Sequence, residues 1–458
     1  MAQPGNNDTT SNDEKTSPAE LNGISEGLTT SRLRQAFPQF CAVSAKNLLL
    51  LTFGSTLGFS TVLIPELQKE NAEIPVTMEE LTWISSLNLF LVPIGCFASG
   101  PVSQLLGRKR TMMLTTIPFI AAWIIFYYST TAEMLFIALA MAGLTGGLLE
   151  APVMTYVAEV TQPHLRGMLS ATSTMAVILG IFTQMLGGKL GNWRILTMIN
   201  LIYPLICLVA LCLVPESPYW LVAKGRQREA ERALCWLRGW VSPIHVQSEL
   251  RIICEDVQKP AESKEKIWKS FGKRTFYVPF LLVSSAFCIG AFGGASTIQT
   301  YALLIFDSLN APLDKYTAAV FLGLAELVGT LLSVCAIHFT GKRLLTFLSV
   351  GGTGMCFCLV AVYGYLTQAD MINTEGISWI PMTLLIGAAF LSHAGIKLLP
   401  WVLAGEVFPV QVGLPSLKRK FQSIMSTIWH KDNPNTTRTK ISCMEIGPSF
   451  PEHHPNLT

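Results

Sequence analysis

Charged residues are scarce in this chain of 458 residues, and their scarcity excludes most classes of soluble protein. Only 14% of the residues are Asp, Glu, Lys or Arg, half are hydrophobic, and the mean hydropathy is +0.43. A soluble chain of this composition would have too little polar surface to cover itself. The composition therefore predicts a polytopic membrane protein.

Signatures of nucleic-acid binding, metal binding and catalysis are also missing from the sequence. No long basic stripe accompanies the net charge of +3, which argues against a nucleic-acid partner. The eleven cysteines lie mostly inside apolar runs, without a CxxC pair or a Cys/His ligand spacing, so we expect neither a metal site nor a disulfide framework. No nucleophile and base pair or phosphate-binding loop stands out, so we expect no enzyme and no cofactor.

Long apolar runs are what the sequence does contain. Each run has about the twenty residues that a helix needs to cross the hydrocarbon of a bilayer. The runs are continuous rather than alternating, which excludes a membrane β-barrel and predicts an all-α protein. We expect about ten spans, at residues 46–66, 84–106, 111–130, 134–157, 168–190, 195–214, 276–306, 316–339, 344–366 and 378–404.

The loops between these runs divide by charge. The loops after the second, fourth, sixth and eighth runs are basic, whereas the loop after the first run is acidic. By the positive-inside rule, the basic loops and both termini face the cytoplasm of a multi-pass protein. We expect five segments: a disordered N-terminal tail (1–45), a six-helix bundle (46–214), a cytoplasmic helical insert (215–275), a partial four-helix bundle (276–412) and a polar, disordered cytoplasmic tail (413–458).

Two short motifs recur six spans apart. Gly107-Arg108-Lys109 follows the second run and Gly341-Lys342-Arg343 follows the eighth, as expected of a duplicated transporter. Three further segments are distinctive: Glu159 to Gly167, Pro215-Glu216-Ser217-Pro218-Tyr219-Trp220-Leu221, and Pro400-Trp401 followed by Gly405-Glu406-Val407-Phe408-Pro409. With these segments, the chain resembles the sugar porter family of the major facilitator superfamily, and within it the insect facilitated trehalose transporter-like proteins.

The resemblance implies a 6+6 helix architecture and a plasma-membrane carrier that moves trehalose or a hexose by alternating access. It also implies a network of charges at the cytoplasmic helix ends, which ties the two halves together when the carrier is closed inward. The residues of this network are Arg108, Arg110, Glu159, Arg166, Glu216, Arg343 and Glu406. The chain departs from the family at Gln104 and His338, where the family has an acid, so the expected network is thinner than the family pattern.

The same resemblance assigns substrate-binding residues. It implies that Gln184, Ser296 and Tyr301 contact the sugar and that Trp401 stacks on its ring, whereas Gly290 and Ala291 replace the family's glutamine pair. At three further positions the chain carries an ionisable residue of its own, namely Glu326, His393 and Lys397.

Ionisable groups at membrane depth usually face a cavity or one another. We therefore expect Glu326 to compensate Lys397 or His393 beside the substrate. The alternative is that Lys397 reaches the interface and Glu326 lies near a helix end. Residues 58–61 of the first span contain no acid, which favours facilitated diffusion over proton symport. Coupling through Glu326 or His393 stays open.

Beyond Val412 the sequence is polar and contains no twenty-residue apolar run, so we expect spans eleven and twelve of the family to be absent. Two functions are compatible with these features. The first is a facilitative sugar transporter whose partners are a small-molecule sugar and the lipid bilayer. The alternative is a truncated, non-transporting isoform that acts as a membrane binding or regulatory partner.

Overall fold

Helices form every regular element that the structure describes. The structure is a computed structural model and describes residues 32–258, 274–309, 312–369, 377–400 and 403. Within these residues, eight helices are long and apolar enough to cross a membrane, and two shorter apolar helices span Tyr277–Phe292 and Trp379–Ala394. The prediction of an all-α, multi-pass protein with about ten spans is confirmed.

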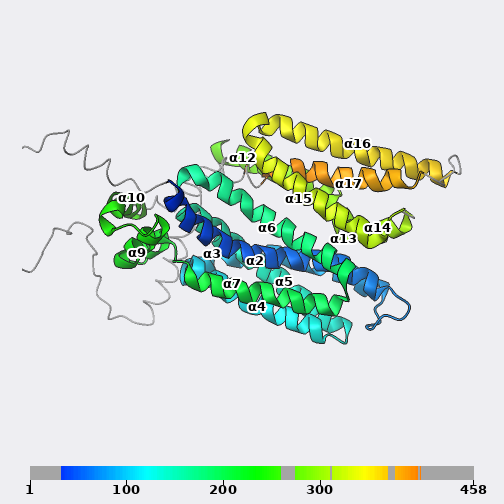
Figure 1. The fold of residues 1–458 in the computed structure, drawn as a ribbon, viewed down its shortest axis with the longest axis horizontal. Helices are drawn as coiled ribbons and strands as arrows, with labels where there is room; N and C mark the ends of the chain where they lie inside the picture. Colours follow the sequence, from blue (N-terminus) through cyan, green and yellow to red (C-terminus); the bar gives the residue numbers. More distant parts are fainter. Residues whose placement is uncertain (1–31, 259–273, 310–311, 370–376, 401–402, 404–458) are drawn as a thin grey trace, which may run out of the picture.

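The first half of the chain forms a bundle of six long helices that run side by side (Figure 1). A small helical insert follows them and lies at one end of this bundle, which we term the insert end; the opposite end is the far end. The bundle contains α2 (Arg32–Leu67), α3 (Met78–Leu106), α4 (Arg108–Tyr128), α5 (Ala132–Val160), α6 (Pro163–Leu190) and α7 (Trp193–Leu213). The insert contains α8 (Pro218–Ala223), α9 (Gln227–Leu237), a 3₁₀ turn (Pro243–Val246) and α10 (Gln247–Gln258).

Helix α2 corrects the expectation of a disordered tail over residues 1–45. It begins at Arg32, and residues 1–31 lie outside the described residues. The early start is stabilised by tertiary contacts rather than by apolar composition. The Gln39 side chain accepts a hydrogen bond from the Gln162 backbone N–H at 2.8 Å and donates to the Gln162 side chain at 3.1 Å. Because such pairing satisfies the first turn of α6, the extension of α2 is part of the bundle.

Local sequence explains where α3 begins and how it packs. Thr77 and Glu80 form a capping box, in which the Glu80 carboxylate accepts from the Thr77 backbone N–H at 2.7 Å. Further along, α3 crosses α5 so closely that a Cβ on Gly147 would lie 2.0 Å from the Val92 carbonyl oxygen. Small residues permit this close approach of the two backbones. In lipid the hydrophobic effect does not drive helices together, so van der Waals packing of this kind holds them in contact.

The second half contains four spans, two of which are interrupted (Figure 1). The expected seventh span, 276–306, is three helices: α12 (Arg274–Phe292), α13 (Ala295–Thr300) and α14 (Ala302–Ser308). The first break is at Gly293-Gly294, where Gly294 has a φ of +75°, a conformation that only glycine adopts without strain. The remaining helices are α15 (Lys315–Thr340), α16 (Lys342–Gln368) and α17 (Trp379–Ala394). Helix α17 ends at Ala394, before Gly395, so the expected span 378–404 is only partly in this helix over the described residues.

The hydrophobic cores show where the halves meet. One core cluster, from Ala42 to Leu237, is built from the first-half bundle together with Leu237 of the insert. Another cluster joins the halves, because Ile181 and Met185 of α6 pack with Ala319 and Leu322 of α15. These α6 residues lie in the half of the helix nearer the far end, so packing between the halves is concentrated there.

Three expectations fall outside the described residues. They are the polar tail 413–458, the ring-stacking Trp401 and the network residue Glu406.

Candidate functional site

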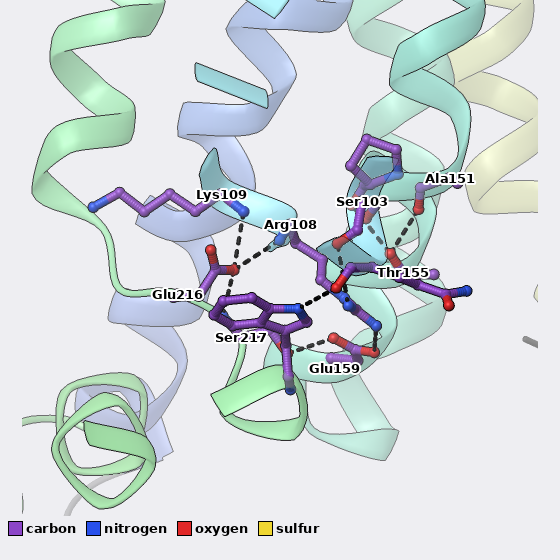
Figure 2. A network of polar contacts seen from close by, with 11 residues as sticks. Ser103, Arg108, Lys109, Ala151, Thr155, Glu159, Glu216 and Ser217 are labelled. Atoms are coloured by element: carbon purple, nitrogen blue, oxygen red, sulfur yellow. Dashed lines mark hydrogen bonds and ion pairs between the residues drawn. The ribbon is translucent and has the colours of Figure 1, made fainter. Parts of the chain in front are cut away.

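The insert end of the first half carries a buried ion pair. An Arg108 Nη donates to a Glu159 carboxylate oxygen at 2.8 Å, and the Arg108 side chain is only 3% exposed (Figure 2). The other Glu159 oxygen accepts a short hydrogen bond from the Ser217 hydroxyl. Arg108 begins α4, Glu159 ends α5 and Ser217 begins α8, so one carboxylate fixes three helix ends. Buried charges of this kind are stable only when paired and hydrogen-bonded.

Glu216 provides the second part of this network. Its carboxylate accepts from the backbone N–H groups of Arg108 at 3.0 Å, Lys109 at 2.9 Å and Arg110 at 3.4 Å (Figure 2). These are the first N–H groups of α4, which have no partner inside their own helix. A carboxylate at this position also faces the positive end of the helix dipole. Glu216 therefore caps α4 from a segment more than a hundred residues away.

Gly107 makes this cap possible. It has a φ of +106°, and a Cβ at this position would lie 2.5 Å from a Glu216 carboxylate oxygen. Glycine is thus required both by conformation and by space. The Trp220 indole N–H donates to the Gln104 carbonyl oxygen at 3.0 Å and covers the same turn. The glycine of the repeated motif is therefore explained by the carboxylate that it faces.

The insert is joined to the bundle beside this network. Ser217 accepts from the Trp220 backbone N–H and Pro218 occupies the first turn of α8. Arg238 donates twice to the Glu249 carboxylate, at 2.9 and 2.5 Å, and once to the Val160 carbonyl oxygen at 3.2 Å. Burial, and then the nearby carboxylates of Asp256 and Glu249, raise the pKa of Tyr219 above its usual value.

The side chains of the other described members do not join the network. The side chains of Arg110 and Arg166 are exposed and make no ion pair within the described residues. Arg343, which occupies the second copy of the motif, is also exposed, with no hydrogen bond or ion pair in the described part of the chain. In this structure the network links helices of the first half to each other. A link between the halves stays a prediction, and Glu406 lies outside the described residues.

Gln184 lies in the middle of the first half and is fully buried. Its amide and the Asn200 amide donate to each other, with both N···O distances at 2.8 Å. The Gln184 N–H also lies 3.2 Å from the Thr183 hydroxyl. The predicted sugar-contacting amide is therefore already paired across α6 and α7, and a substrate would have to displace or join this pair.

The ionisable residues of the second half gather around α13. The Glu326 carboxylate, in the middle of α15, is 1% exposed and accepts from the Gln299 amide at 2.7 Å. The Lys397 ammonium donates to the Ser296 hydroxyl at 2.6 Å and is partly buried. His393 is buried, and its Nδ1 lies 3.0 Å from the Ala389 carbonyl oxygen.

The expected compensation between these groups is therefore indirect. Glu326 and Lys397 are not within 4 Å of each other, although their charges interact. Each group is held by a neutral side chain, and compensation beside the substrate stays a prediction. The alternative placed Glu326 near a helix end, whereas it lies in the interior of α15.

Hydrogen bonds between the halves occur at their far ends. The Tyr301 phenol donates to the Ser85 hydroxyl at 2.8 Å. The Thr61 hydroxyl donates to the Gln299 carbonyl oxygen at 2.9 Å, and the Tyr316 phenol donates to Glu66 at 3.2 Å. Tyr301 thus bridges the halves in this structure instead of pointing to a separate site. In the described residues, no group of three His, Cys, Asp or Glu side chains is placed to hold a metal ion.

Comparison with known proteins identifies the family. The family model described as "Sugar (and other) transporter" matches residues 41–428, which is most of the chain. The chain belongs to this sugar transporter family. It is a transporter and not an enzyme.

Curated relatives of this transporter share about a quarter of its residues. The facilitated trehalose transporter Tret1 of Bombyx mori is 26% identical over 376 residues, covering 82% of this chain and 73% of the relative. The sugar transporter ERD6-like 6 of Arabidopsis thaliana is 27% identical over 366 residues, covering 79% of this chain and 74% of the relative.

Solved structures share the fold. The proton:xylose symporter XylE bound to 6-bromo-6-deoxy-D-glucose gives a TM-score of 0.64 at 21% identity, covering 87% of this chain and 90% of XylE. A partially occluded, inward-open form of XylE from E. coli gives 0.63 at 20% identity, covering 84% and 90%. At this identity the likeness establishes the architecture of the transporter and nothing finer.

Sequence reasoning missed several polar residues of the transporter core. Asn200 and Gln299 hold predicted site residues, and each could have been found as an amide inside an apolar run. Lys46 was also missed, because the search of the first span looked only for an acid. It is fully buried in α2, and its ammonium donates to the Ser173 hydroxyl of α6.

Proposed function

We propose that this transporter carries a sugar, trehalose or a hexose, down its gradient across the plasma membrane by alternating access. The insert end and both termini face the cytoplasm in this proposal. The basic turn at Arg108, Lys109 and Arg110 lies at the insert end, which supports this orientation by the positive-inside rule. The sugar class is supported by the family and by the names of the curated relatives.

One observation carries the alternating-access part of the proposal. The hydrogen bonds that join the halves, Tyr301 to Ser85 and Thr61 to Gln299, lie toward the far end. The ion pair and cap at the insert end involve the first half alone. A carrier whose halves are joined at the far end is closed there and opens at the insert end. Rocking of the halves would break these bonds and close the insert end instead.

Cross-linking tests this mechanism directly. Alternating access requires Ser85 and Tyr301 to separate in each cycle, so a disulfide between Ser85→Cys and Tyr301→Cys should stop uptake of labelled trehalose or glucose into proteoliposomes. Reduction should restore it. The native cysteines are replaced first, so that the engineered pair is the only reactive one.

A matched control uses a pair within one half. The Asn47 amide donates to the Thr172 hydroxyl at 2.9 Å, and both residues belong to the first-half bundle. A disulfide between Asn47→Cys and Thr172→Cys should leave uptake at the level of its reduced form. Undiminished uptake with the Ser85 and Tyr301 positions fully cross-linked would contradict alternating access at this gate.

Gln184 gives a second test of the sugar site. Gln184→Ala should abolish uptake if this amide contacts the sugar. Asn200→Ala removes the same buried amide pair but leaves Gln184 free to bind. Uptake by Asn200→Ala with a similar thermal midpoint would assign the loss in Gln184→Ala to substrate contact. Equal loss in both variants would assign Gln184 a structural role.

A further inference from the structure

Helix α13 holds two opposite charges apart. Ser296 and Gln299 are three residues apart on this short helix and therefore share a face. Ser296 accepts from the Lys397 ammonium at 2.6 Å, and Gln299 donates to the Glu326 carboxylate at 2.7 Å. Two neutral side chains of one element thus separate a cation from an anion that would otherwise pair.

Glu326 and Lys397 differ in how accessible their polar groups are to a ligand. Glu326 is 1% exposed and its carboxylate is held by Gln299. Lys397 is only partly buried, and within the described residues no carboxylate oxygen lies within 4 Å of its ammonium. An ammonium has three N–H donors, and Ser296 uses one of them. The group available to a ligand at this position is therefore cationic.

The position of α13 also suits a transported ligand. The Gln299 carbonyl oxygen accepts from Thr61 of the first half, and the adjoining Tyr301 contacts Ser85. A molecule bound beside Ser296 and Lys397 therefore lies close to the boundary between the halves. Interrupted helices at such a boundary are common binding elements in transporters, since their free polar groups can face a cavity.

A neutral sugar would form weaker hydrogen bonds with Lys397 than a carboxylate would. Its hydroxyls pair best with neutral donors and acceptors, yet Gly290 and Ala291 offer no side-chain hydrogen bond on α12. A carboxylate would accept charge-assisted hydrogen bonds from Lys397, which are about twice as strong as neutral ones. It would also give a partly buried cation its missing counter-charge.

We infer that the transporter binds sugars that carry a carboxylate, such as hexuronates, with the carboxylate on Lys397 and the ring hydroxyls beside Ser296. This inference rests on the proposed sugar transport and narrows its substrate class.

Binding to the purified, full-length protein tests the inference without depending on transport. Glucuronate, glucose and glucosamine are compared as ligands by competition and by thermal shift, and the readout is the ratio of glucuronate to glucose affinity. We expect this ratio to favour glucuronate in the unaltered protein. In Lys397→Gln it should fall by roughly tenfold or more, whereas Lys397→Arg should retain most of it.

Lys189→Gln is the matched control, because this lysine is exposed at the far end of α6 and its loss should leave the ratio unchanged. A ratio that stays constant in Lys397→Gln would overturn the inference, as would a preference for glucosamine. Binding and uptake of glucose without any binding of glucuronate would overturn the inference and leave sugar transport standing. Failure to bind or transport any of the three sugars would overturn both.

Discussion

The two halves of this transporter carry the same turn motif in different surroundings. In the first half, Gly107 and Arg108 lie under the Glu216 carboxylate, and Arg108 is buried against Glu159. In the second half, a Cβ on Gly341 would meet nothing within 4 Å, and Arg343 is exposed. The repeated motif therefore predicts a repeated turn, but the surroundings of the two glycines and of these two arginines differ.

The buried polar side chains of the two halves also have different partners. The first half closes its central amides on each other through Gln184 and Asn200. The second half places a carboxylate and an ammonium beside α13 without pairing them. The first half also buries the Lys46 ammonium, which donates to the Ser173 hydroxyl, so each half holds a cationic side chain on a serine. The halves differ in the carboxylate, because Glu326 lies beside α13 in the second half.

Replacing the motif arginines should break this comparison most clearly. Arg108→Met leaves Glu159 without its buried partner, so we expect a loss of about 3–5 kcal/mol in the free energy of unfolding. Arg343→Met should change it by less than about 0.5 kcal/mol, because this side chain is exposed. Unfolding of the purified variants in mixed micelles measures both values. Equal losses would show that the second copy has a buried partner too.

Alanine at the two motif glycines gives the next largest effect. Gly107→Ala places a Cβ 2.5 Å from a Glu216 oxygen at a φ of +106°, whereas Gly341→Ala meets only the backbone strain of a φ of +75°. We expect a loss of about 2–3 kcal/mol for the first substitution and about 1 kcal/mol for the second. Thermal midpoints of the two variants, compared side by side, check the difference. A larger effect at Gly341 would reverse the ranking of the two turns.

Features set by neighbouring residues could be predicted from the sequence, whereas contacts between residues far apart in the chain could not. Helices and capping residues were predictable, since apolar length, Ser217 and Pro218 act locally. The start of α2 at Arg32 was not, because it depends on Gln39 meeting Gln162 across the bundle. The predicted network named Arg108, Glu159 and Glu216, and the structure brings these three together, whereas the side chains of Arg166 and Arg343 are exposed.

The candidate site shows the same limit. The sequence identified Glu326 and Lys397 as unusual, and burial at membrane depth suggested that they would pair. The break at Gly294 turns α13 so that Ser296 and Gln299 reach them instead. The break in the helix changes which side chains meet, and hydrophobic periodicity does not predict where such a break falls.

The charge on Glu216 should contribute a smaller, separable amount. Glu216→Gln keeps a carbonyl oxygen that can accept from the Arg108 and Lys109 N–H groups, but it removes the negative charge at the start of α4. We expect a loss of about 1 kcal/mol, which is the size of a helix-dipole interaction in a partly buried setting. Glu216→Ala, which removes the acceptor as well, should cost more. Equal losses in unfolding measurements would assign the whole effect to the hydrogen bonds.

The smallest effect should come from an ion pair of the second half. Lys315 and Asp307 approach to 3.1 Å, but the Asp307 side chain is 58% exposed, so water and salt screen the attraction. Asp307→Asn should therefore change the free energy of unfolding by less than about 0.5 kcal/mol. Measurement at low and high salt sharpens the contrast with Arg108, whose buried pair should respond little to ionic strength. A loss at Asp307 as large as that at Arg108 would mean that the second half is also tied by charge, only at its far end.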